Sequence, residues 1–429
     1  MGSVETHSSD TLKAASAQYR EYVPDPDHPR VKGITSSDSY KWTNKRLADP
    51  WFRDWVDSWE RKYNEPFKGI TTDGNVRQGL FHLDSSNEDS IEPATKTMVD
   101  AAQDLLAIAT PEQRKSIQHG LEAPEWRGWS NPEIVFKKHG LRLEEVSEEL
   151  VKATHKLLQA SLSPEGYVKA RGCMKVNGFL GKIVNGPKVL NENSYFVSVF
   201  GNPSPFEPWG WQLFGHHLCM NCLVVGGQQV ISPVFMGAEP NIVDEGFDSG
   251  LTLFTEQEAL AMSLMAALPE SIRESVLISP SMDGSSIPAW RFHRADQRHL
   301  GGAFQDNRVI PYEGAQVSTF PRPQQDQVYE LIRISLNYLP ERALKARMDE
   351  IFHHWSETYF AWIGQHGRGD AFYYKIQSPV VMLEFDHHSG VFLANKQAEP
   401  FHIHTLVRTP NGNDYGKELV RQFRQRQSR

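Results

Sequence analysis

The feature that most constrains the fold of this 429-residue chain is a change of residue pattern near position 190. Before it, apolar residues recur every three or four positions in WFRDWVDSWERKY and LEEVSEELVKATHKLLQASL, which is the period of an amphipathic helix. After it, aromatic and β-branched runs such as NSYFVSVFGNPSP, broken by glycine and proline, are typical of strands and turns. The pattern predicts an α+β protein in which a helical N-terminal half packs around a mostly antiparallel sheet formed by the C-terminal half.

The chain divides into an N-terminal arm and a body. Residues 1–40 are polar and contain PDPDHPR, so we expect an extended or partly disordered arm there. Residues 41–429 are expected to form a single large domain without internal repeats, helical over 41–185 and sheet-rich over 190–429. TPEQRK and SPEGY each place a proline after a capping residue and predict helix starts. Further helices are expected at 255–268, at 324–364 and in the C-terminal KELVRQFRQRQ.

Composition and charge exclude several classes of protein. The formal net charge is −8 and the basic residues are spread along the chain, so nucleic acid is not an expected partner. Three cysteines are too few for a disulfide framework in a chain of this size. No stretch approaches the roughly 18 apolar residues of a membrane span, and the N-terminus lacks the apolar segment of a signal peptide. We therefore expect a soluble, cytoplasmic protein without a membrane partner, whose oligomeric state the sequence leaves open.

Clustered histidines are the strongest chemical signal in the chain, and the sharpest cluster is FHIHTLVR near its end. Side chains alternate between the two faces of a strand, so His402, His404 and Arg408 share one face, with the two histidine Cα atoms about 7 Å apart. Two imidazoles arranged in this way predict a pair of metal ligands. Arg408 could hold a carboxylate or phosphate of a substrate on the same face, or instead form a salt bridge with Asp414.

A carboxylate in the apolar run VVMLEF is a candidate third ligand. Burying Glu384 there is costly unless it is paired or bound to a cation. If the two strands pair antiparallel around a connection centred near Leu393, Glu384 falls directly opposite His402. The pattern then predicts a site made of two histidines and one carboxylate. A structural ion pair between Glu384 and an arginine or lysine is the alternative.

The stretch GHHLCMNC offers a further ligand. Read as a strand, it places His217 and Cys219 on one face and His216 and Cys222 on the other. The two cysteines then diverge, so a CxxC metal or redox pair is not expected. Either histidine could bind the metal, and we favour His217 because its face is the more polar. His216 is left as a candidate catalytic group, together with Glu384 and Arg408.

Four aromatic residues lie close in sequence to these candidates and could wall an apolar pocket for an aromatic or terpenoid substrate, although packing in the core is an alternative for each. They are Trp209, Trp211, Tyr373 and Tyr374. His387 and His388 follow the VVMLEF strand, where we expect a surface loop. The chain contains no Walker loop, G-x-S-x-G elbow or dinucleotide fingerprint, so no kinase, serine hydrolase or dehydrogenase is predicted and no organic cofactor is expected.

The order of several motifs resembles that of a known family. FGNPSP, WGWQLFGHHLCMN, PVFMGAEP, FYYKIQSP, VVMLEF and HIHTLVRTPNGNDYG are similar, over residues 85–425, to a family of bacterial and fungal proteins catalogued as domain of unknown function 3500. The resemblance brings no assigned reaction. It implies that a Gly-His-His element, a carboxylate strand, a His-x-His pair and a tail are family features, here His216, His217, Glu384, His402, His404, Arg408, Asp414 and Gly416. The chain departs from the pattern of bacterial members at Asp386, His387 and His388, where they tend to have an asparagine and a shorter loop, and at Cys219, often a serine.

These observations predict a mononuclear metal-dependent enzyme that acts on a small organic molecule. Glu384, His402, His404 and His217 would hold a divalent ion with one position open. Zinc is the first expectation and gives a hydrolase or lyase, whereas iron, copper or manganese would support an oxidoreductase that uses dioxygen. A non-catalytic protein with a structural metal or a histidine-lined pocket for a ligand is the alternative from another class.

Overall fold

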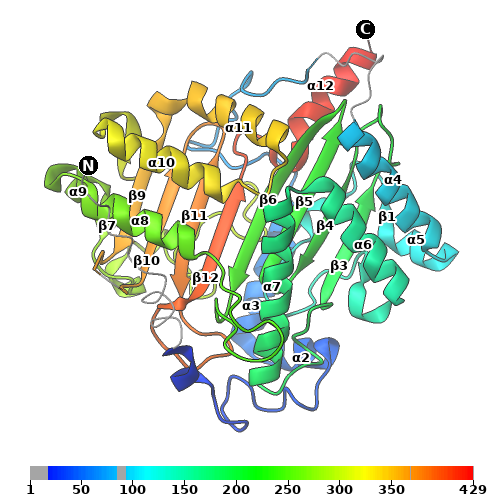
Figure 1. Ribbon diagram of the computed structural model, residues 1–429, viewed down its shortest axis with the longest axis horizontal. Helices are drawn as coiled ribbons and strands as arrows, with labels where there is room; N and C mark the ends of the chain where they lie inside the picture. The colour runs from blue at the N-terminus through cyan, green and yellow to red at the C-terminus, as the bar shows by residue number, and fades with distance from the viewer. Residues whose placement is uncertain (1–17, 85–92, 368, 429) are drawn as a thin grey trace.

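A twelve-stranded sheet runs through the middle of the protein, as the computed structural model shows for residues 18–84, 93–367 and 369–428 (Figure 1). Its strand order is β1-β3-β4-β5-β6-β12-β11-β10-β9-β7, with β2 beside β3 and β8 beside β9. The strands are β1 Gln118–His119, β2 Leu141–Arg142, β3 Tyr195–Phe200, β4 Trp209–Gly215, β5 Leu218–Val225, β6 Gln228–Ala238, β7 Leu277–Ser279, β8 Ala315–Gln316, β9 Tyr359–Gly364, β10 Phe372–Gln377, β11 Met382–His388 and β12 Glu399–Arg408.

The α+β class is confirmed, with one correction to the sheet. The sheet is mixed, because β1 pairs with β3 and β7 with β9 in parallel, while the strands between these edges pair antiparallel. Every residue of β3, β5, β10 and β11 is buried. Aromatic and β-branched residues dominate these strands because both faces of the sheet are covered and neither side of a strand meets water.

Helices form the layers on either side. They are α2 Ser39–Arg46, α3 Pro50–Tyr63, α4 Pro93–Ile108, α5 Pro111–Ile117, α6 Glu148–Ser161, α7 Pro164–Ile183, α8 Thr255–Ala267, α9 Glu270–Val276, α10 Arg322–Ser335, α11 Glu341–His353 and α12 Lys417–Gln427. Both predicted starts are confirmed: Thr110 and Gln113 form a capping box at α5, and Ser163 accepts a hydrogen bond from Gly166 N at α7. Among the described residues, no helix is long and apolar enough to cross a membrane.

The single helical segment expected at 324–364 is wrong. It is two helices followed by a strand, since α10 ends at Ser335, α11 begins at Glu341, and β9 occupies the end of the range. Pro340 lies immediately before α11. Proline fixes φ, lacks an N–H donor and disfavours helix in the residue before it, which explains the break. The predicted N-terminal arm falls partly outside the described residues, since its first 17 residues are not among them; within the rest, Tyr19 is fully buried.

Register assigns side chains to the two faces of the sheet. His404 lies opposite Asp386 of β11 and opposite Gly237 of β6. We call the side that carries His402 and His404 the histidine face. It is covered by α3, which lies behind the sheet in Figure 1, by α2 at the lower edge of the picture, and by irregular segments between the elements. Two stacked aromatic pairs attach these helices, Trp42 with Phe392 and Trp59 with Phe304. Helices α6, α7, α8, α10 and α11 cover the opposite face (Figure 1).

Candidate metal centre

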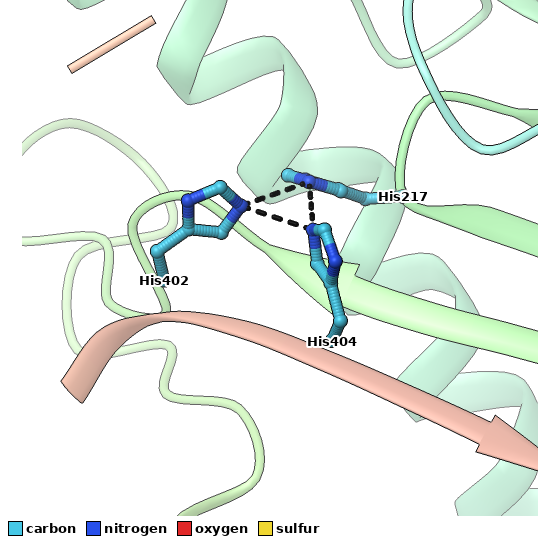
Figure 2. Close-up of side chains that lie close together, drawn as sticks. All are labelled: His217, His402 and His404. Carbon is cyan, nitrogen blue, oxygen red and sulfur yellow. Dashed lines mark hydrogen bonds between the residues drawn. The ribbon is translucent and has the colours of Figure 1, made fainter. Parts of the chain in front are cut away.

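Three histidines converge on the histidine face. His402 and His404 come from β12, and His217 comes from the connection between β4 and β5. Their Nε2 atoms form a triangle with sides of 3.0 Å between His402 and His404, 3.2 Å between His404 and His217, and 3.4 Å between His402 and His217 (Figure 2). All three side chains are at most 6% exposed. The predicted shared orientation of His402 and His404 is confirmed, and of the two histidines in GHH the triangle contains His217.

His217 is placed by a tight turn rather than by a strand, which corrects the expected strand across GHHLCMNC. Strand β4 ends at Gly215 and β5 begins at Leu218, so the two histidines form the whole connection. His217 has a φ of 61°, a left-handed conformation that is uncommon outside glycine. Two backbone hydrogen bonds hold it there: His217 N donates to Asn131 O, and His217 O accepts from Gly237 N.

Gly237 makes room for the triangle. It lies opposite His404 in the β6–β12 pairing. A Cβ at this position would lie 3.1 Å from His404 Cδ2, 3.2 Å from His217 Cδ2 and 2.7 Å from Ile403 O. The two imidazoles therefore approach each other over a position that no larger residue could occupy without displacing them.

The donor set fits a divalent metal ion. Burial lowers the pKa of all three histidines well below its ordinary value, and each also lies near other imidazoles. A neutral imidazole carries a single N–H, so three converging nitrogens cannot all find a hydrogen-bond partner among themselves. Nitrogens bound about 2.0–2.1 Å from a tetrahedral zinc ion lie about 3.3–3.4 Å apart, close to the spacing seen here. Within the described part of the chain, no fourth histidine, cysteine or acid joins this group.

A buried carboxylate stands behind His402. Glu239 Oε1 lies 3.7 Å from His402 Nδ1, and the Glu239 side chain is fully buried. Burial raises the pKa of Glu239 to about 7 even though three backbone N–H groups, from residues 391–393, donate to it. Carboxylates commonly orient metal-binding histidines from this side. Glu239 was not predicted from the sequence, although an acid directly after the apolar run PVFMGA is a signal comparable to the one that singled out Glu384.

Two more histidines adjoin the triangle. His299 Nε2 lies 3.2 Å from His404 Nδ1, and the His388 ring centroid is 4.4 Å from that of His404. Nitrogens of His299, His388 and His404 lie within 4.8 Å of one another. The expected surface loop at His387 and His388 is wrong, because both residues complete β11 and are buried; His387 points to the opposite face, toward Glu258. His299 was not predicted, because it stands alone in DQRHLGG without a neighbouring histidine or a strand pattern.

The predicted position of Glu384 is wrong. It pairs with Leu406 instead of His402, because the register of the β11–β12 pair shifts between two neighbouring residues of β11. His387 pairs with Ile403, whereas His388 pairs with Glu399. Its carboxylate accepts hydrogen bonds from Leu300 N, Gly301 N and the Tyr373 hydroxyl. Glu384 is therefore satisfied within the loop at 299–301 and is not brought to the three histidines.

Arg408 is neutralised by acids. Its Nη2 lies 2.6 Å from Asp306 Oδ1 and its Nε 2.9 Å from Asp414 Oδ2, with all three side chains buried. The salt bridge to Asp414 was the alternative considered for Arg408, and it is the arrangement present. With two carboxylates against its guanidinium, Arg408 is placed to hold the chain together rather than to meet a substrate.

The other predicted site residues are not members of the triangle. His216 stacks on His217 with ring centroids 3.8 Å apart, and its Nδ1 contacts Asn177 Oδ1 at 2.7 Å. Trp211 lies on the helix side, where its Nε1 donates to Ser161 Oγ of α6. Trp209 lies two residues before it in β4 and therefore shares its face of the sheet. Tyr374 stacks on Phe385 on that same face. These three aromatic rings are packed in the core.

Comparisons with known proteins agree with the motif order in the sequence. Neither the curated proteins nor the solved structures gave a match. A family model described as protein of unknown function (DUF3500) matches residues 92–417 of the 429, a span that contains the sheet and all five histidines of the centre. The chain therefore belongs to the DUF3500 family of proteins of unknown function.

Proposed function

We propose that this protein is a metal-dependent enzyme that acts on a small organic molecule and holds one divalent ion at His217, His402 and His404. The observation that carries the proposal is the triangle of Nε2 atoms at ligand spacing without a fourth protein ligand among the described residues. Structural zinc sites are closed by four protein ligands, whereas catalytic sites keep three and leave one position for water or substrate.

The ligand set favours zinc and non-redox chemistry. When bound, zinc would supply a Lewis acid that polarises a carbonyl group and lowers the pKa of a coordinated water, which suits a hydrolase or a lyase. Glu384 lies elsewhere, so the set of two histidines and one carboxylate that suits iron and dioxygen is not assembled from the predicted residues. The Glu239 carboxylate, 3.7 Å from His402 Nδ1, is beyond hydrogen-bond distance and would act on His402 through its charge. Gly237 would leave the space that the rings of His217 and His404 occupy.

A structural metal site is the second candidate, and the burial of the centre favours it. His402 is fully buried. A cavity of about 840 Å³ between α4, α11 and the start of β6 is lined by Arg347 and Thr409 but by none of the three histidines. A structural ion would raise stability without binding exogenous ligands, whereas a catalytic ion must accept them.

The first experiment compares metal content in the wild type, in the double variant H402Q/H404Q and in the control variant H387Q. His387 is a matched control because it is equally buried and adjacent to the centre but faces the other side of β11. We expect at least one equivalent of zinc per chain in the wild type and in the control. The double variant should lose the ion. Folded wild type that binds no zinc, cobalt or copper after reconstitution would overturn the proposal.

The second experiment separates catalytic from structural metal. Cobalt(II) replaces zinc and reports its ligands in the visible spectrum. Added azide should change that spectrum if a coordination position is open. An unchanged spectrum, together with a large drop in Tm on metal removal, would favour the structural candidate and direct work away from assays of hydrolysis and elimination.

A further inference from the structure

We propose that the centre holds two metal ions, with His404 as an imidazolate bridge between the site at His217 and His402 and a second site at His299 and His388. The inference rests on the proposed metal site at the three histidines and extends it. The second site takes a cation that prefers imidazole ligands, of the class of copper(II) or zinc.

The geometry of His404 suggests the bridge. Its Nε2 lies 3.0 and 3.2 Å from the Nε2 atoms of His402 and His217, while its Nδ1 lies 3.2 Å from His299 Nε2. Both ring nitrogens of His404 are therefore directed at other imidazole nitrogens. The two groups of potential ligands, one on each side of this ring, share no other residue.

His388 has a conflict that a cation would resolve. Its Nδ1 lies 2.9 Å from Ser389 O and its Nε2 lies 3.1 Å from Ala295 O. A neutral imidazole has one N–H, so one of these contacts places a nitrogen lone pair against a carbonyl oxygen. If Nδ1 keeps the proton for Ser389 O, the lone pair of Nε2 and the oxygen of Ala295 are two donors facing a shared position near His404.

His299 has a similar deficit. Its ring is almost completely buried, and its Nδ1 has no hydrogen-bond partner among the residues that the structure describes. If both rings are neutral, the contact between His299 Nε2 and His404 Nδ1 is a hydrogen bond only when one nitrogen carries its proton and the other presents its lone pair. A cation bound by both nitrogens would replace that proton, and His404 would then be coordinated on both sides.

The proton balance of the bridge is defined. A His404 that binds the first ion through Nε2 keeps a proton on Nδ1. Binding of the second ion forms a bond to Nδ1 and releases that proton to solvent. Filling the second site should therefore release one proton more than coordination of His299 and His388 as neutral ligands would.

Copper(II) titration of the metal-free, full-length protein tests the bridge, with electron paramagnetic resonance as the readout. We expect two equivalents to bind. The first equivalent should give a full signal, and the second should reduce the signal per copper sharply, because an imidazolate couples two copper(II) ions magnetically. H299Q and H388Q should each bind one equivalent with an uncoupled signal, a twofold reduction, and the control H387Q should behave as the wild type.

Each other outcome is decisive. One equivalent in the wild type would overturn the second site and leave the proposed function intact, whereas no metal at all would overturn both. Two equivalents with uncoupled signals would overturn the bridge. Retention of one equivalent shows that H299Q or H388Q is folded; if one of them loses both ions and its circular dichroism, the other decides. Two coupled ions in both variants would place the second site elsewhere and overturn the assignment.

Discussion

At the scale of residues, the centre depends on the absence of a side chain as much as on the histidines. Gly237 lies under His217 and His404, and the atoms around it leave no space for a methyl group. Interiors are packed densely enough that such an addition displaces neighbours rather than filling a gap. This steric restriction does not apply to every glycine, since a Cβ at Gly120 would meet no atom of the described residues within 4 Å.

We therefore expect G237A to weaken metal binding. The added methyl group would push the imidazoles apart and cost about 1–3 kcal/mol of stability, as overpacking of a core does. Metal affinity and the free energy of unfolding in denaturant should both fall, while the control G120A should match the wild type in both. A G237A protein with wild-type affinity would show that the two rings can move without loss of the site.

At the scale of elements, strand β11 anchors the loop that carries His299. Glu384 receives two backbone N–H groups from residues 300 and 301 and the hydroxyl of Tyr373 on β10. A carboxylate can accept all three hydrogen bonds because it offers only acceptors. Strand, loop and neighbouring strand are thus joined at one side chain close to the histidines but separate from the triangle.

E384Q should keep the ion bound by His217, His402 and His404. The amide would place an N–H group against one of the donors around position 384, which should cost about 1–3 kcal/mol for an unsatisfied buried group. Denaturant unfolding measures this loss, and elemental analysis should find the ion of the triangle still present. A folded E384Q protein without metal would restore Glu384 as a ligand and contradict the site described here.

At the scale of the whole molecule, a buried charge network ties distant segments together. Asp306 accepts hydrogen bonds from Arg127 Nε, from Arg408 Nη2 at the end of β12 and from the Tyr415 hydroxyl. Burial alone would raise the pKa of Asp306, but the charges of Arg408 and Arg127 outweigh it and hold the pKa below its ordinary value. The network stabilises the fold only while Asp306 is ionised.

The sign of the pH dependence follows. A lowered carboxyl pKa gives stability that is fully present above the unfolded-state pKa of about 4 and is lost as pH falls through the folded-state pKa. D306N should lower the free energy of unfolding at pH 7 by about 3–5 kcal/mol, because it leaves buried arginines with one fewer charge partner. The difference between wild type and D306N should shrink below pH 4 in denaturant unfolding. A difference independent of pH would show that the loss is one of packing.

The sequence alone determined the class of the fold and the shared orientation of one pair of histidines. Helical periodicity, capping residues and β-branched runs act over a few residues, so the starts of α5 and α7 and the position of β12 could be predicted locally. The alternation of side chains in a strand likewise placed His402 and His404 on one face. These features need no knowledge of the partner strands.

The sequence favoured His217 as a further member of the group, but only the tertiary structure decided how it and the other residues join that pair. Glu384 pairs four residues away from its predicted partner. A shift by an even number keeps every side chain on the same face, so the hydrophobic pattern could not reveal it. His217, His299 and His388 meet His404 through a tight turn, a loop and the end of β11, which are more than ten residues apart in the chain. Such contacts depend on register and loop length, which the alternation of residues does not encode.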